Sequence, residues 1–262
     1  MNRLERKLSR LAKSKQKALA LFLTAGYPRI DSTVDLVLNL EGAGADIIEL
    51  GMPFSDPLAD GPVIQQCSSV ALHNGVTLGT IIDDVKKIRV RSGIPIVLMG
   101  YLNPILRYGD EVFFRVISAA GVDGIILPEL PLEEAGRFKE TIDRNGLSHI
   151  LLITPTTPGE RIEAIDSASS GFVYCVSIRG ITGRTDGPPA LEYIQEAKKH
   201  VNKNPLLVGF GISTPAQAKR YAKEADGVII GSELLRRIQE LGTGVELLQW
   251  VRDLNNAVSQ LA

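Results

Sequence analysis

Short apolar runs alternate along the chain with segments of helical period. Eight runs rich in Leu, Ile and Val have the length of β-strands, and they cover residues 18–24, 46–51, 94–99, 124–127, 149–154, 172–176, 206–209 and 227–230. Between them, apolar residues recur every three or four positions, as they do on one face of an α-helix. Strands that alternate with helices predict parallel βαβ units.

The segments between the strands carry signals of helix ends. Ser32 has the side chain of an N-cap, and Pro131 is expected at the first position of a helix over residues 132–145. Gly146 follows that helix, where a residue in the left-handed conformation commonly ends one. The Thr-Pro pair at residues 214–215 opens another helix.

Eight strand–helix units after residue 17 fit an α/β fold, the (β/α)8 TIM barrel, which typically has ~250 residues. The alternative is a doubly wound open sheet, whose GxGxxG fingerprint the chain does not carry. The nearest match, Gly209-Phe-Gly211, lacks the third glycine. Because no linker or change of composition divides the chain, we expect one barrel domain over residues 1–262.

The first seventeen residues are strongly basic. Seven of them are Lys or Arg, against one acid, Glu5, and such a stretch could end an organelle transit peptide. However, Leu4, Leu8 and Leu11 form the apolar stripe of a helix that lies on a larger body. We therefore predict an N-terminal capping helix within residues 1–17, and a cytoplasmic location with an organelle as the alternative.

Composition narrows the classes of function. Hydrophobic residues make up 44% of the chain and charged residues 23%, which is ordinary for a folded globular protein. No apolar run reaches the roughly 18–20 residues of a membrane span, and a net charge of −1 provides no field for binding nucleic acid. Two cysteines, Cys67 and Cys175, cannot form a disulfide framework. A cytosolic enzyme or binding protein is favoured.

In a (β/α)8 barrel the active site lies at the carboxyl ends of the strands. His149 comes at the start of its predicted strand, and His73 and His200 fall in or after helices, so we expect surface roles and no metal site. None of the twelve lysines lies at the carboxyl end of a strand, which argues against a Schiff-base mechanism.

Glu49 does lie near the carboxyl end of its strand. Strand alternation places it on the face opposite to Ile48 and Leu50, which suit the helix layer, so Glu49 points into the barrel near its rim. Burial there raises the pKa of a carboxyl group and fits it to exchange a proton near neutral pH. Asp56 and Asp60 follow in the next loop, where either one could be catalytic or could only stabilise a turn.

A phosphate site is expected beside this carboxylate. Loops after strands 7 and 8 of such barrels often bind phosphate through backbone amides. Residues 209–213 follow the seventh predicted strand and Gly231-Ser232 follow the eighth, and their small side chains let the backbone approach an anion. The loop over residues 177–190 is long and carries three glycines, as a mobile lid would.

Residues 49–65, ELGMPFSDPLADGPVIQ, resemble the signature of the tryptophan synthase alpha chain family. Five further segments of the family pattern occur in the same order, at residues 22–28, 99–104, 180–183, 209–213 and 231–232. The resemblance covers nearly the whole chain. It implies a lyase that cleaves indole-3-glycerol phosphate to indole and glyceraldehyde 3-phosphate in tryptophan biosynthesis.

The resemblance also implies roles for single residues. Glu49 matches the glutamate that moves the proton at indole C3, Asp60 matches the aspartate that stabilises charge at the indole nitrogen, and Tyr174 matches a tyrosine near the glutamate. This favours Asp60 over Asp56. The matching substrate-binding positions are Phe22, Tyr101 and Leu127 around the indole, Thr182 in the lid, and Gly183, Phe210, Gly211, Gly231 and Ser232 at the phosphate.

The family resemblance implies a partner. We expect a tryptophan synthase beta chain in an alpha2-beta2 heterotetramer, with pyridoxal phosphate on the beta chain only and no cofactor on this chain. Two alternatives are a stand-alone lyase that releases free indole and a weakly catalytic subunit that activates its partner. Two residues depart from the family pattern, because Glu129 stands where Asp is usual and Arg179 comes one place later than a common arginine.

Overall fold

The computed structural model describes residues 1–176, 190–209 and 211–259. Its strands form one sheet in which every pairing is parallel. They are β1 Ala18–Thr24, β2 Ile47–Gly51, β3 Ile96–Met99, β4 Gly124–Ile126, β5 Ser148–Ile150, β6 Leu152–Ile153, β7 Val173–Val176, β8 Leu206–Gly209 and β9 Gly227–Ile230. All eight predicted strands are confirmed, and the fifth is divided into β5 and β6.

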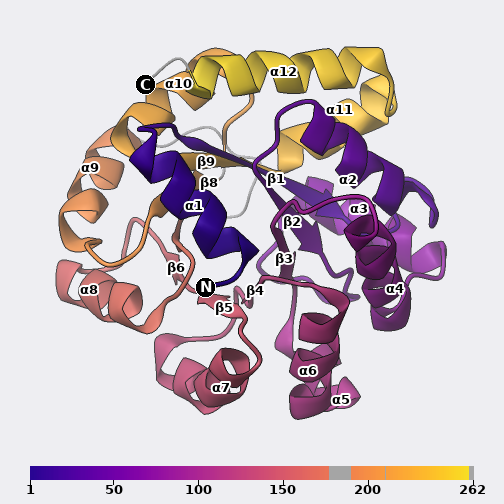
Figure 1. Cartoon of the computed structure of the whole chain (residues 1–262), viewed down its shortest axis with the longest axis horizontal. Coiled ribbons are helices and arrows are strands. Elements are labelled where there is room, and N and C mark those ends of the chain that lie inside the picture. Colours follow the sequence, from indigo (N-terminus) through magenta and orange to yellow (C-terminus); the bar gives the residue numbers. More distant parts are fainter. Residues whose placement is uncertain (177–189, 210, 260–262) are drawn as a thin grey trace.

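The helices surround the strands (Figure 1). Within the described ranges they are α1 Arg3–Lys13, α2 Ser32–Gly42, α3 Pro62–His73, α4 Leu78–Arg89, α5 Leu102–Tyr108, α6 Asp110–Ala120, α7 Leu132–Arg144, α8 Gly159–Ala168, α9 Ala190–His200, α10 Pro215–Glu224, α11 Ser232–Leu241 and α12 Val245–Ser259. No helix in these ranges is long and apolar enough to cross a membrane. The Thr-Pro start of α10 is confirmed, since the Thr214 side chain accepts a hydrogen bond from the backbone of Gln217.

The sheet closes on itself at the fifth predicted strand. The strand order is β5-β4-β3-β2-β1-β9-β8-β7-β6, so β5 and β6 stand at its two ends. They are consecutive in the chain, separated only by Leu151, whose carbonyl accepts a hydrogen bond from the Tyr174 amide. One stretch of chain therefore pairs with β4 on one side and β7 on the other, and the predicted TIM barrel is confirmed.

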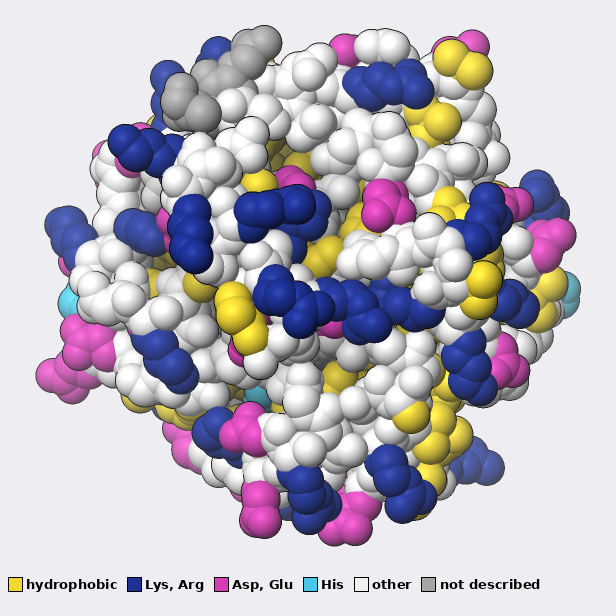
Figure 2. Space-filling model, viewed as in Figure 1, with side chains coloured by type: hydrophobic (Ala, Val, Ile, Leu, Met, Phe, Trp, Pro, Cys, Tyr) yellow, Lys and Arg dark blue, Asp and Glu magenta, His cyan; other side chains and the backbone are white. Residues whose placement is uncertain are grey.

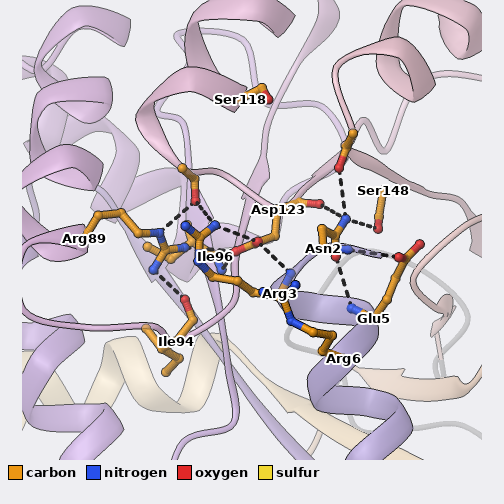
Figure 3. Close-up of polar contacts among 12 residues, drawn as sticks. Asn2, Arg3, Glu5, Arg6, Arg89, Ile94, Ile96, Ser118, Asp123 and Ser148 are labelled. Carbon is orange, nitrogen blue, oxygen red and sulfur yellow. Dashed lines mark hydrogen bonds and ion pairs between the residues drawn. The ribbon is translucent and has the colours of Figure 1, made fainter.

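The predicted capping helix is also confirmed. α1 buries Leu4, Leu8 and Leu11, the predicted stripe. Its N-cap residue, Asn2, donates through its side-chain amide to the Asp123 carbonyl and the Ser148 hydroxyl, both at 2.9 Å. Those two residues lie where β4 and β5 begin, so α1 covers the amino-terminal mouth of the barrel (Figure 3).

Asp123 connects α1 to the strands and helices around this mouth of the barrel. Its buried carboxylate accepts from the guanidinium groups of Arg3 at 3.2 Å and Arg89 at 2.9 Å, and from the Ile96 amide at 3.0 Å (Figure 3). A buried charge with this many donors is well compensated. The outer face of α1 stays basic, and Figure 2 shows Lys and Arg side chains gathered in this region.

Two predicted helix starts are wrong by one position. Asp31, not Ser32, is the N-cap residue of α2, and the Ser32 hydroxyl instead accepts from the Arg29 amide in the preceding turn at 3.1 Å. Pro131 is itself the N-cap residue of α7, with extended backbone, which suits its fixed φ equally well. Gly146 follows α7 with φ +69°, as predicted.

The surface role predicted for His149 is wrong. His149 lies in β5 with 1% of its surface exposed. Its side chain faces the helix layer, where α7 packs on β5, and the charges of Lys139 and Asp143 on that helix act on it. Burial lowers the pKa of His149 to about 4, so the imidazole is neutral. His73 is exposed, as expected.

Candidate active site

Glu49 lies in β2 with its side chain fully buried. Neither carboxylate oxygen has a hydrogen-bond partner among the residues that the structure describes. Burial penalises the charged form and raises the pKa of Glu49 to about 8. The predicted burial and raised pKa are confirmed, and the group is mainly protonated at neutral pH.

Asp60 lies in the loop between β2 and α3, at the carboxyl-terminal mouth of the barrel. Burial raises its pKa to about 6. A hydrogen bond from the Tyr101 hydroxyl at 3.1 Å opposes this shift, and the negative charge of Glu129 adds to it. Asp60 is therefore mainly ionised at pH 7, in the same mouth as the neutral Glu49.

The structure distinguishes the candidate Asp60 from the candidate Asp56, which the sequence of their loop alone does not do. Asp56 is exposed and accepts a hydrogen bond from the Ser55 hydroxyl at 2.6 Å. Asp60 instead faces an internal cavity. The two aspartates of one loop thus have different environments, and burial raises the pKa of Asp60.

Tyr101 connects the Asp60 loop to the next rim segment. It is the residue before α5, and its hydroxyl accepts from the Ala59 amide at 3.0 Å while donating to Asp60. Its ring packs against Phe54, with 5.2 Å between the ring centroids. Tyr101 therefore holds this loop at three of its residues.

A small cavity lies beside Asp60 and Tyr101. Its polar lining comprises Asp60, Tyr101, Thr24 and Ser68. The remaining lining residues are apolar or glycine, namely Phe22, Gly51, Met52, Ile64, Met99, Gly100 and Pro128. Such a lining suits a flat aromatic ligand with one polar edge. The predicted Leu127 is buried directly before Pro128.

Sequence reasoning missed two polar residues of this cavity. Thr24 ends β1, and its buried hydroxyl has no hydrogen-bond partner in the described part of the chain. The rule that strand carboxyl ends face the site could have identified it. Ser68 lies within α3, where no sequence signal distinguishes it from the other polar residues of that helix.

Tyr174 belongs to the same mouth. It is buried in β7. Burial raises its pKa well above the usual value, and so do the negative charges of Glu49 and Asp60, which are both ionised in the pH range where a tyrosine titrates. Gly209 makes room for its ring, because a Cβ at that glycine would lie 2.3 Å from the Tyr174 hydroxyl oxygen. The three predicted catalytic residues therefore lie within electrostatic reach of one another.

The described half of the predicted phosphate site adjoins Phe22. Gly231 precedes α11 and leaves the helix without a side-chain cap, so the amides of Ser232 and its neighbours in the first turn are available to an anion. A Cβ at Gly231 would lie 3.4 Å from the Phe22 Cβ. Gly211 has φ +75°, which glycine adopts without strain.

Part of the predicted site lies outside the described residues, namely Thr182, Gly183, Phe210 and residues 177–189 of the expected lid. Within the described ranges, no group of three or more His, Cys, Asp or Glu side chains could hold a metal ion. The roles predicted for all of the site residues stay predictions.

Comparison with known proteins gives a consistent result. The family profile described as Tryptophan synthase alpha chain matches residues 8–261. A tryptophan synthase alpha chain from Geotalea daltonii is 49% identical over 249 residues, covering 94% of each chain, and one from a Thermoanaerobacter species is 44% identical over 262 residues, covering 100% of each. A crystal structure of the Legionella pneumophila alpha chain superposes with a TM-score of 0.91 at 36% identity, over 100% of this chain and 99% of that one. The chain therefore belongs to the tryptophan synthase alpha chain family.

Proposed function

We propose that the chain is a carbon–carbon lyase that cleaves indole-3-glycerol phosphate to indole and glyceraldehyde 3-phosphate, as the alpha subunit of tryptophan synthase. The observation that carries the catalytic assignment is a pair of carboxyl groups in one mouth. Their environments set the pKa of Glu49 to about 8 and that of Asp60 to about 6. Two carboxyl groups separated in this way can serve as a proton donor and as an anionic stabiliser at the same pH.

The reaction requires one protonated and one ionised carboxyl group. Breaking the bond between indole C3 and the side chain needs an indolenine, which forms when C3 is protonated. Neutral Glu49 supplies that proton, while ionised Asp60 accepts the hydrogen bond of the ring N–H and stabilises its developing positive charge. The Glu49 carboxylate then takes the proton of the adjacent side-chain hydroxyl, the C–C bond breaks, and its electron pair returns to the ring. Glu49 ends protonated, ready for another cycle.

The other site residues bind and orient the substrate in this proposal. Phe22, Tyr101 and Leu127 enclose the indole, and Tyr174 stands beside Glu49. The phosphate binds to backbone amides of the loops after β8 and β9, which contain Gly211, Gly231 and Ser232. Gly183 and Phe210 are the further phosphate-binding positions of this proposal, and Thr182 belongs to the lid. The uncapped start of α11 favours an anion there.

We also propose that the chain binds a tryptophan synthase beta chain in an alpha2-beta2 heterotetramer in the cytoplasm, with pyridoxal phosphate held by the beta chain. Support comes from a groove at the rim, whose lining includes Pro53, Phe54, Asn103 and Pro104. Pro53 and Phe54 belong to the loop that carries Asp60, and Asn103 and Pro104 belong to α5. An apolar product released there would benefit from a sheltered route to a second enzyme.

An indole-release assay tests the proposal. The purified chain, alone and with a beta chain, is given indole-3-glycerol phosphate, and we expect indole release that rises when the beta chain is added. Full activity alone, unchanged by the beta chain, would indicate a stand-alone lyase, and a complex that releases no indole would indicate an activating subunit. The value of kcat/KM should rise through pH about 6 and fall above about 8, following Asp60 and Glu49.

A further inference from the structure

The residue at the start of α5 does not cap the helix with its side chain. Tyr101 is the N-cap residue of this helix and makes no capping hydrogen bond with its side chain. Its hydroxyl instead lies between the Ala59 amide and the Asp60 carboxylate. The first amides of α5 therefore need an acceptor from another part of the chain.

Glu129 supplies that acceptor. Its carboxylate accepts a hydrogen bond from the Leu102 amide, the first in α5, although the two residues are 27 positions apart. Glu129 lies in the tight turn after β4, which the Leu130 amide closes by donating to the Leu127 carbonyl at 3.0 Å. A carboxylate at a helix N-terminus is also favoured by the helix dipole.

The two contacts join three neighbouring rim loops. Because β2, β3 and β4 are adjacent in the barrel, the loops that follow them lie side by side at the mouth. Glu129 connects the third loop to the start of α5, and Tyr101 connects that start to the first loop. Among the described residues Glu129 makes no hydrogen bond to Asp60, and the hydrogen-bonded connection between them runs through the start of α5 and Tyr101.

We propose that Glu129 is a positioning residue for Asp60: it fixes the backbone that carries Tyr101, and Tyr101 in turn holds Asp60 and the Ala59 amide in place. The proposal rests on the proposed function, in which Asp60 acts on the indole nitrogen. It assigns to Glu129 a role at the site without contact with the reacting atoms.

Amide hydrogen exchange in the full chain without substrate gives a test that needs no activity. In Glu129→Ala, the Leu102 amide loses its acceptor and should exchange roughly tenfold faster. If the constraint passes through Tyr101, the Ala59 amide should exchange faster as well. Faster exchange at Leu102 with unchanged exchange at Ala59 would overturn the proposal, because Glu129 would then only cap the helix.

Kinetics supply the second test. Glu129→Ala should lower kcat for indole release roughly tenfold with little change in KM, because the phosphate end still binds while Asp60 is misplaced. Glu129→Gln keeps an acceptor oxygen and should restore activity to within about threefold of wild type. In a Tyr101→Phe background, Glu129→Ala should have less than about a twofold further effect. Fully additive losses would contradict an action through Tyr101.

Glu134→Ala is the matched control. Glu134 is an exposed acid in the first turn of α7, five residues from Glu129, and no hydrogen bond of it to α5 is present. The Glu134→Ala substitution should leave the activity and the exchange rates of the Leu102 and Ala59 amides unchanged. A wild-type chain that releases no indole would refute the proposed function alone, because the Ala59 exchange experiment still decides the role of Glu129.

Discussion

Replacing Glu49 with Gln should stabilise the protein while removing its activity. Gln has almost the same shape, so the packing around β2 should survive. The wild-type carboxyl group is fully buried without a partner in the described part of the chain, and its charged form is costly there. General acid–base help is typically worth about 10²–10⁴-fold, and Glu49 acts in two proton transfers, so kcat should fall by at least about 10²-fold.

The stability gain should depend on pH, and its sign follows from the direction of the pKa shift. The pKa of Glu49 is raised from 4.5 to about 8 on folding, so the folded chain holds this proton more tightly than the unfolded chain. The contribution of Glu49 to stability is therefore lost as pH rises from about 4.5 to about 8, and Glu49→Gln does not undergo this loss. The difference amounts to roughly 3 kcal/mol at pH 7 and roughly 5 kcal/mol above pH 8.

Urea unfolding at pH 5 and pH 8.5 measures the effect. At pH 5 the folded forms of both proteins carry a neutral group at this position, so their free energies of unfolding should differ by less than about 1 kcal/mol. At pH 8.5 the midpoint of Glu49→Gln should exceed that of wild type by about 1 M or more. The control is Glu140→Gln, an exposed glutamate of α7, which should match wild type at both pH values.

Two results would refute this reasoning. An equal stability difference at both pH values would mean that Glu49 does not hold a proton in the folded chain. Cleavage of indole-3-glycerol phosphate by Glu49→Gln within a few-fold of the wild-type rate would mean that Glu49 is not the proton donor.

The remaining predictions concern four residues. Asp60→Asn should severely impair indole release, whereas Asp56→Asn should be nearly silent in the same assay, because only Asp60 faces the cavity. The contribution of His149 to stability should fall by up to roughly 3 kcal/mol as pH drops from about 6.5 to about 4, because its pKa is lowered to about 4 on folding and the unfolded chain binds the proton first. Urea titrations of His149→Gln should lack this contribution when they are compared with wild type at each pH. Gly209→Ala should displace Tyr174 and lower both the melting temperature and kcat, and an unchanged melting temperature would contradict the close approach at this glycine.

The barrel was predictable because parallel strands are buried on both faces. Their apolar runs are therefore continuous, and they indicate even the strand that closes the barrel, although they do not indicate its division at Leu151. The orientation of Glu49 followed from alternation alone. The sequence does not fix the exact helix starts, since Ser32 and Pro131 each suit two adjacent positions.

Long-range contacts account for what the sequence could not show. Asp56 and Asp60 look alike within their loop, and they differ because Tyr101, 41 residues away from Asp60, donates to only one of them. His149 resembles a surface residue at the start of a strand until α7 is packed over it. Glu129 caps a helix that precedes it by 27 residues, a pairing that no local pattern reveals.

The basic helix at the amino-terminal mouth has a kinetic consequence. The first seventeen residues hold seven of the 29 basic and one of the 30 acidic residues, so this segment carries +6 and the rest of the chain −7. The small net charge is thus the sum of a positive N-terminal segment and a negative remainder. The positive segment lies at the end of the barrel opposite to the cavity of Asp60. A phosphorylated substrate is not steered to the site by a long-range field, and its capture depends on short-range contacts with backbone amides. Its association rate should therefore respond only weakly to ionic strength.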